Sequence, residues 1–170
     1  MATHRVSILG ANTIPDTTGR AFFEPYSVKA TNDIFSHLVG VLNDPAAAEA
    51  HGLYGQFPIP KNYVGTASVV VVWTSTAITG NFRSRFQYRA VGGNDTESLD
   101  QATFQETVSV TDAAPGATDR RMEASFTLTA ANLAVDDSMT FLYERLDDTG
   151  VDTLAAAVTV HDILFQYDDV

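Results

Sequence analysis

The sequence predicts an all-β domain, an antiparallel β-sandwich of the jelly-roll type with about eight strands and one short helix in a loop. Residues 67–74 (ASVVVVWT) form a continuous β-branched run, which is typical of a central strand buried on both faces. Residues 82–91 alternate between mainly aromatic and mainly arginine side chains, with the period of two of a half-buried strand. Similar segments recur after turn-rich gaps, and about eight of them favour a jelly roll over an immunoglobulin topology.

The chain divides into a short N-terminal part and one body. We expect residues 1–30 to be an N-terminal arm or edge segment that pairs with the body or with a neighbouring molecule. Within it, residues 6–9 and 21–23 fit short strands, and residues 13–19 fit a turn. Residues 31–170 then form the jelly-roll β-sandwich domain.

The segment before the first long strand is harder to interpret. Residues 34–42 fit either a strand or a helix, and we count them as a strand. Residues 44–50 have an aspartate at the N-cap, a proline at the first helical position and alanines after it, which predicts the short helix. Pro58 and Pro60 indicate an extended connector.

Four more strands are expected in the body, at residues 104–110, 122–128, 139–146 and 154–167. The last one changes phase, because Val158 and Val160 alternate on one register while Ile163 and Phe165 alternate on the other. A β-bulge near His161 brings both sets of side chains to the same face.

Composition and charge exclude several functions. The 170 residues contain no cysteine, so neither disulfides nor thiolate sites are available. The formal net charge of −11 repels phosphates, and no basic patch offsets it, so we expect no nucleic-acid partner. The longest apolar run is too short to span a bilayer, and the first residues lack a signal-peptide layout, so we expect no membrane role.

No catalytic motif is present, so we predict a non-enzymatic protein with no catalytic residues. The sequence contains no GxSxG, P-loop or GxGxxG motif. The four histidines are scattered and show no transition-metal spacing, and His37 is interpreted as a core or edge residue. With 21 acidic residues, accidental carboxylate pairs are expected, and composition alone nominates no glycosidase pair.

Calcium is the one cofactor that the sequence suggests. Asp147, Asp148 and Asp152 lie in one short acidic loop and offer the oxygen ligands that a hard cation prefers. The EF-hand spacing is absent, however, and acidic loops of this kind are more often solvated turns.

Aromatic residues fall into two groups. Trp73, Phe82, Phe86 and Tyr88 occupy inward-looking strand positions, so we expect them in the core. Rings that remain exposed can stack on the apolar faces of sugars, and the freer candidates are Tyr26, Tyr54, Phe57 and Tyr63.

The C-terminal two thirds, about residues 67–170, resembles small β-sandwich virion structural proteins of tailed bacteriophages. The residues that carry the resemblance are FxETVxVTDxAPG at 104–116 and FTLTAANLAVDDSMTFLYERLDDTGVDTLAAAVTVHDILFQY at 126–167. Asp136 stands where that pattern usually has glycine. The resemblance implies a virion component without saying which one.

Among such components, a head-decoration or cement protein fits best. The resemblance then implies a homotrimer in the virion, assembled in the host cytoplasm, with the major capsid protein or another virion protein as its partner. Arg83, Arg85 and Arg89 are the candidate contact residues, although pairing with carboxylates of the same chain is the more frequent role of such side chains. The alternative function is a carbohydrate-binding β-sandwich module, calcium-dependent if the acidic loop binds metal, for host-surface attachment. A small lyase or hydrolase is a third hypothesis.

Overall fold

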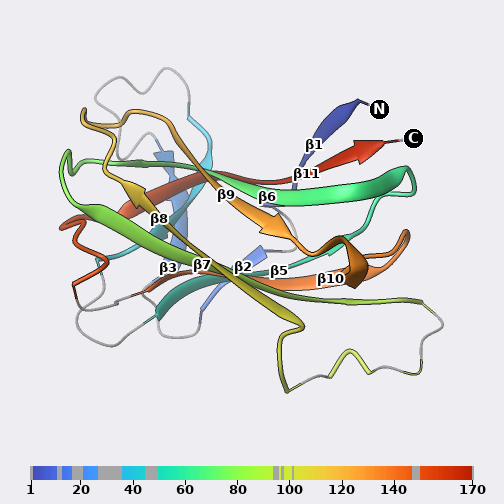
Figure 1. The fold of residues 1–170 in the computed structure, drawn as a ribbon. Helices are drawn as coiled ribbons and strands as arrows, with labels where there is room; N and C mark the ends of the chain where they lie inside the picture. Colours follow the sequence, from blue (N-terminus) through green and yellow to red (C-terminus); the bar gives the residue numbers. More distant parts are fainter. Residues whose placement is uncertain are drawn as a thin grey trace.

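The computed structural model is a sandwich of two antiparallel sheets, which confirms the predicted fold class (Figure 1). It describes residues 2–10, 13–16, 21–26, 36–44, 50–93, 96, 98–100, 102–146 and 150–169. No helix in these ranges is long and apolar enough to cross a membrane.

One sheet has six strands, in the order β3-β4-β11-β6-β9, with β1 also paired to β11. Its strands are β1 (Thr3–Ser7), β3 (Ala21–Pro25), β4 (Leu38–Leu42), β6 (Tyr63–Ser75), β9 (Met122–Leu128) and β11 (Val158–Asp169). The second sheet has five strands, in the order β2-β5-β10-β7-β8. Its strands are β2 (Thr13–Pro15), β5 (Ala50–Pro58), β7 (Asn81–Val91), β8 (Glu106–Ala113) and β10 (Ser138–Leu146). A single turn of 3-10 helix, η2 (Ala130–Asn132), follows β9.

The inner faces of the two sheets enclose an aromatic core. Trp73, Phe82, Phe86 and Tyr88 are fully buried there, which confirms their predicted position. The rings of Trp73 and Phe82 lie 4.9 Å apart between centroids, close enough for a favourable tilted contact. Burial of these rings holds the two sheets together.

The predicted bulge in the last strand is confirmed. The pairing of β11 with β6 shifts between Val160 and Asp162, which leaves His161 without a partner in the register. Because of this extra residue, Val160 and Ile163 are both fully buried in the core.

Two strands were not predicted. β5 covers residues 50–58, where no strand was expected, and ends at Pro58, where the expected connector begins; the expected helix falls largely on residues 45–49, which lie outside the described part. Gly52 and Gly55 weaken the strand signal of this segment, yet close packing requires them: a Cβ at Gly52 would lie 2.6 Å from Leu142 Cδ1. β2 lies where we expected part of a turn.

The described parts of residues 1–30 pair with strands of the same chain. β1 pairs with β11, β2 with β5, and β3 with β4. The first pairing is reinforced by Asp169, whose carboxylate accepts a hydrogen bond from the Ala2 backbone at 2.7 Å and contacts His4 Nε2 at 2.7 Å.

Candidate functional site

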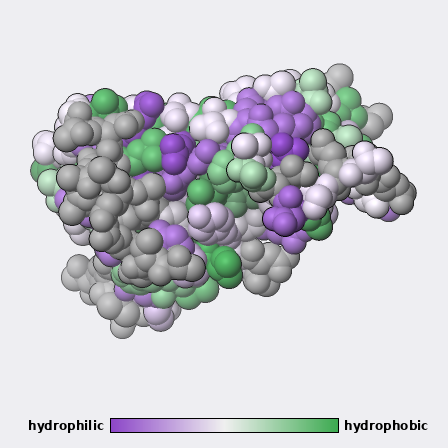
Figure 2. Space-filling view, turned by 90° about the horizontal axis from the view of Figure 1, so that it is seen from below, coloured by the Kyte–Doolittle hydropathy of each residue, from purple (hydrophilic) through white to green (hydrophobic). Residues whose placement is uncertain are grey.

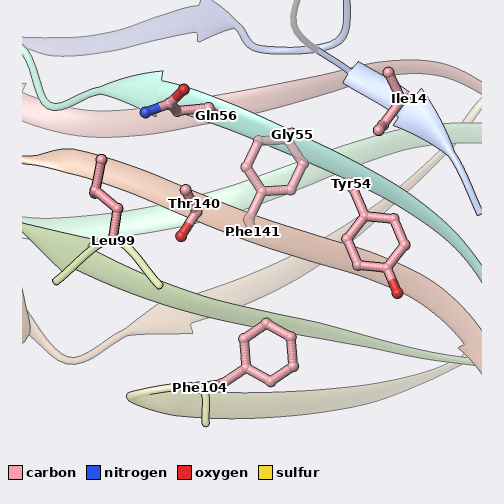
Figure 3. A pocket seen from close by; sticks show the side chains of 8 residues that line it. All are labelled: Ile14, Tyr54, Gly55, Gln56, Leu99, Phe104, Thr140 and Phe141. Atoms are coloured by element: carbon pink, nitrogen blue, oxygen red, sulfur yellow. The ribbon is translucent and has the colours of Figure 1, made fainter. Parts of the chain in front are cut away.

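A groove of about 470 Å³ lies on the five-stranded sheet (Figure 3). It is lined by Ile14, Tyr54, Gly55, Gln56, Leu99, Phe104, Thr140 and Phe141. Figure 2 looks at the side of the molecule that this sheet occupies in Figure 1, and hydrophobic and hydrophilic residues are interspersed there.

The alternation of strand β5 places two of the lining side chains. Leu53 and Phe57 are buried in the core, so Tyr54 and Gln56 point to the opposite, outer face of the sheet. In the antiparallel register with β10, Gln56 lies opposite Thr140, and on the other side β2 places Ile14 opposite Tyr54. Three neighbouring strands thus supply one wall and the floor.

Beneath the floor, on the core side of the sheet, the packing of the buried Phe141 ring requires a glycine. A Cβ at Gly55 would overlap the ring of Phe141, its partner in the β5 and β10 register, so only glycine lets that ring pack against the β5 backbone. The segment between β7 and β8 supplies the other wall through Leu99 and Phe104.

The groove collects exposed apolar side chains. Tyr54 is 44% exposed and Phe104 is 42% exposed, and they are the two aromatic members of the exposed large hydrophobic residues in the described chain. Ile14 and Leu99, at 63% and 64%, are also exposed and lie on the same groove. Apolar surface concentrated in a concave site is a common property of ligand-binding sites.

Polar groups lie between these apolar walls. Gln56 donates a hydrogen bond to Ser138 Oγ at 2.6 Å, and Thr140 Oγ1 donates to the Arg89 carbonyl at 3.4 Å. A side-chain amide and a hydroxyl have more donor and acceptor positions than these bonds use. A smaller hollow of about 110 Å³, lined in part by Arg89, continues from the groove past Leu99, Phe104 and Thr140.

The described lining residues of the groove include no aspartate, glutamate, histidine or cysteine. The carboxylate, imidazole and thiol groups that most often act in acid–base or nucleophilic catalysis are therefore absent from the described lining, and Tyr54 is its one ionisable side chain. The arrangement is suited to binding by ring stacking and hydrogen bonding.

Of the four rings expected to be free, one lies on the groove. Tyr54 is exposed as predicted, whereas Phe57 and Tyr63 are buried in the core, so the prediction was wrong for those two. Tyr26 is half-buried against His161. Phe104 was assigned to a strand; it precedes β8, and no local pattern shows that its ring remains exposed.

The three arginines proposed as contact residues all bond within the chain. Arg85 Nε lies 2.5 Å from Glu144 Oε1, a buried carboxylate. Arg83 Nη1 donates to Thr111 Oγ1 at 2.9 Å, and Arg89 Nε donates to the Thr103 carbonyl at 3.2 Å. Their contact with another molecule stays a prediction.

The proposed calcium ligands are only partly described. Asp147 and Asp148 lie outside the described residues. Asp152 is buried, and its two carboxylate oxygens accept hydrogen bonds from Arg145 Nη2 at 2.7 Å and Nε at 3.0 Å. Asp152 is thus the counter-ion of a buried arginine, and the described residues contain no group of three metal-ligating side chains from His, Cys, Asp and Glu.

The residues that carry the phage resemblance form part of the framework. Glu106 accepts hydrogen bonds from Thr129 Oγ1 at 2.8 Å and from Asn132 Nδ2 at 3.2 Å, and so fixes the turn after β9. Burial opposes ionisation of this glutamate, but the hydrogen bonds from Tyr88, Thr129 and Asn132 outweigh it and lower the Glu106 pKa. This explains a charged residue within an otherwise apolar alternation.

A comparison with protein-family models gives no match, and neither does a comparison with curated proteins. Solved structures do match. A family 35 carbohydrate-binding module from Clostridium thermocellum has a TM-score of 0.53 at 13% identity, and the match covers 99% of both chains.

Two further structures show the same likeness. The CBM22-1 xylan-binding domain of Paenibacillus barcinonensis Xyn10C has a TM-score of 0.52 at 10% identity, covering 98% of this chain and 94% of that domain. A family 11 module from Clostridium thermocellum, in complex with a mixed-linked tetrasaccharide, has a TM-score of 0.54 at 5% identity, covering 99% and 96%. These similarities show that the chain has the β-sandwich fold of such modules.

Proposed function

We propose that this protein is a non-catalytic carbohydrate-binding β-sandwich module whose glycan lies in the groove between Tyr54 and Phe104. The observation that carries the proposal is the position of the exposed rings. In the described chain, both exposed aromatic residues line one groove whose described lining residues include no carboxylate or imidazole.

The chemistry of the groove suits a sugar. A pyranose ring has apolar C–H faces that pack on aromatic rings, and hydroxyls at its edge that exchange hydrogen bonds with amides and alcohols. Tyr54 and Phe104 offer the rings, while Gln56 and Thr140 offer the polar groups. An apolar lining with a few placed polar groups is the usual composition of a small-ligand site.

The fold comparison supports the same class. Modules that match over almost the whole chain include one described as a xylan-binding domain and one in complex with a tetrasaccharide. The likeness concerns the fold alone, so the groove residues of this chain have to be tested directly.

The test is a panel of soluble plant and bacterial polysaccharides in affinity electrophoresis, followed by calorimetry on whichever glycan binds. We expect Tyr54→Ala and Phe104→Ala to weaken binding by about tenfold or more each, because central aromatic contacts dominate binding energy. Ile78→Ala is the matched control, since Ile78 is also exposed but lies outside the groove lining. This variant should bind the glycan with the affinity of the wild type.

Two results would overturn the proposal. One is a wild-type protein that is folded and binds no glycan of the panel. The other is glycan binding that Tyr54→Ala and Phe104→Ala leave intact, which would place the sugar site elsewhere.

The capsid-decoration hypothesis stays a second candidate, because an exposed apolar groove also suits contact with another protein. The comparisons lend it no support beyond the β-sandwich fold. Its test is the solution mass by light scattering and the melting temperature of phage capsids with the protein added. A trimer that stabilises capsids supports this hypothesis, and a monomer that capsids ignore removes it.

A further inference from the structure

Tyr26, His37, Thr74 and His161 meet at the bulge of β11, although His37 and His161 are 124 positions apart. His37 Nε2 and His161 Nδ1 lie 2.9 Å apart. The other nitrogen of His161, Nε2, lies 2.9 Å from Thr74 Oγ1. The Tyr26 ring stands edge-on to His161, with 4.6 Å between centroids.

The bulge and the strand ends beside it bring the two imidazoles close together. His161 is the extra residue of the bulge and has no register partner on β6. Tyr26 follows β3 and His37 precedes β4, and the Tyr26 backbone N–H donates to the His37 carbonyl at 2.8 Å. This bond holds the ends of β3 and β4 together beside the bulge.

The His37–His161 pair offers a nitrogen lone pair to a metal ion. Two facing ring nitrogens at hydrogen-bond distance share one proton, so one of them presents a lone pair. A neutral imidazole is the form that binds metals.

We propose that His37 Nε2 and His161 Nδ1 together bind a divalent transition-metal ion such as Cu²⁺, Ni²⁺ or Zn²⁺. With metal–nitrogen bonds of about 2.0–2.1 Å, two adjacent ligands are separated by about 2.9 Å at a right angle and about 3.3 Å at the tetrahedral angle. The observed separation of 2.9 Å falls in this range, so the metal takes the place of the shared proton once both rings turn until their nitrogen lone pairs converge on the ion.

In the part of the chain that the structure describes, these two imidazoles are the protein ligands, because no group of three His, Cys, Asp or Glu side chains that could hold a metal ion occurs there. Imidazole ligands suit copper, nickel and zinc, and copper should bind most tightly among them.

The experiment is calorimetric titration of the full chain with NiCl₂ and with ZnCl₂ at pH 7.5. The wild type should bind one ion per chain, and His37→Asn should bind at least about tenfold more weakly. His4→Asn is the matched control, because His4 contacts Asp169 and no second histidine, and its affinity should equal that of the wild type.

A second measurement does not depend on a buried substitution. The electron paramagnetic resonance spectrum of bound Cu²⁺ should show coupling to two imidazole nitrogens in the wild type and to fewer in His37→Asn, whose substitution is at an exposed side chain. Equal affinities of wild type and His37→Asn, or a spectrum unchanged by the substitution, would overturn the proposal. Glycan binding plays no part in either measurement.

Discussion

Two regions of the molecule depart from the usual pattern of charged residues outside and apolar residues inside. Near Arg145 a charge is buried, and at the Tyr54 groove aromatic rings are exposed. Arg145 is a charged side chain with no exposure, and it contacts Asp152 as well as the Leu154 and Ala156 carbonyls at 2.5 and 2.6 Å. Tyr54 and Phe104 are rings left in solvent. Because the buried charge is bonded within the chain, it maintains the fold, whereas the two rings keep part of their surface exposed on the groove, where a ligand can reach them.

The largest expected effect removes the partner of the buried charge. Asp152→Ala should lower the free energy of unfolding by about 3–5 kcal/mol, because it leaves the Arg145 guanidinium buried without its main counter-ion. Urea unfolding followed by fluorescence measures this loss. Asp44→Ala is the control: Asp44 contacts the same guanidinium at 3.2 Å but is 54% exposed, so the loss should stay below about 1 kcal/mol.

Substitution in the groove should affect glycan binding and leave the stability of the fold nearly unchanged. Tyr54→Ala, which weakens glycan binding in the proposed function, should change the free energy of unfolding by no more than about 0.5 kcal/mol. If Tyr54→Ala destabilised the protein as strongly as Asp152→Ala, the ring would be structural and the distinction between the two regions would fail.

The sequence predicted the framework better than the site, for a physical reason. Strand β9 was predicted with its exact observed bounds, and the buried rings of β7 with it, because the period of two is a property of the strand backbone. The bulge at His161 was visible as a change of phase. These signals are local, so one segment suffices to show them.

The groove and the histidine pair have no such local signal. Ile14, Tyr54 and Phe104 come from three separate segments, and only the strand pairing brings them together. β5 itself was missed, since Gly52 and Gly55 reflect the space left by partner side chains on β10 rather than strand propensity. Spacing along the chain likewise could not show that His37 faces His161.

An effect of intermediate size is the dependence of the free energy of unfolding on pH. The His161 pKa is lowered from 6.5 to about 4, so the unfolded chain binds a proton more readily than the folded chain. The stabilisation is complete above pH 6.5 and is lost as the pH falls through about 4. Allowing for partial exposure, we expect a loss of about 1–2 kcal/mol over this window.

Unfolding in urea at several pH values between 7 and 4 measures the loss. His161→Asn should flatten the slope relative to the wild type, and the slope rather than the absolute stability decides the result. Glycan affinity should stay constant while the protein is folded, because the described groove lining includes no Asp, Glu or His. Equal slopes in both proteins would show that His161 does not titrate in this window.

A further small effect on stability tests the turn before β10. Asp136 has a φ of 65°, in the left-handed region, and its backbone N–H donates to the Ile59 carbonyl at 3.2 Å. Left-handed backbone favours glycine, which is the residue that the phage pattern usually has at this position. Aspartate tolerates the conformation better than most residues, and glycine adds entropy to the unfolded chain, so the two effects partly cancel.

Asp136→Gly should therefore raise the free energy of unfolding by only about 0.5 kcal/mol, while Asp136→Ala should lower it by about 1 kcal/mol because alanine tolerates the left-handed backbone less well than aspartate. Thermal unfolding resolves both shifts. Neither variant should alter glycan affinity, since Asp136 is not among the described groove residues. If alanine were as stable as glycine, the left-handed backbone would not explain the glycine of the pattern.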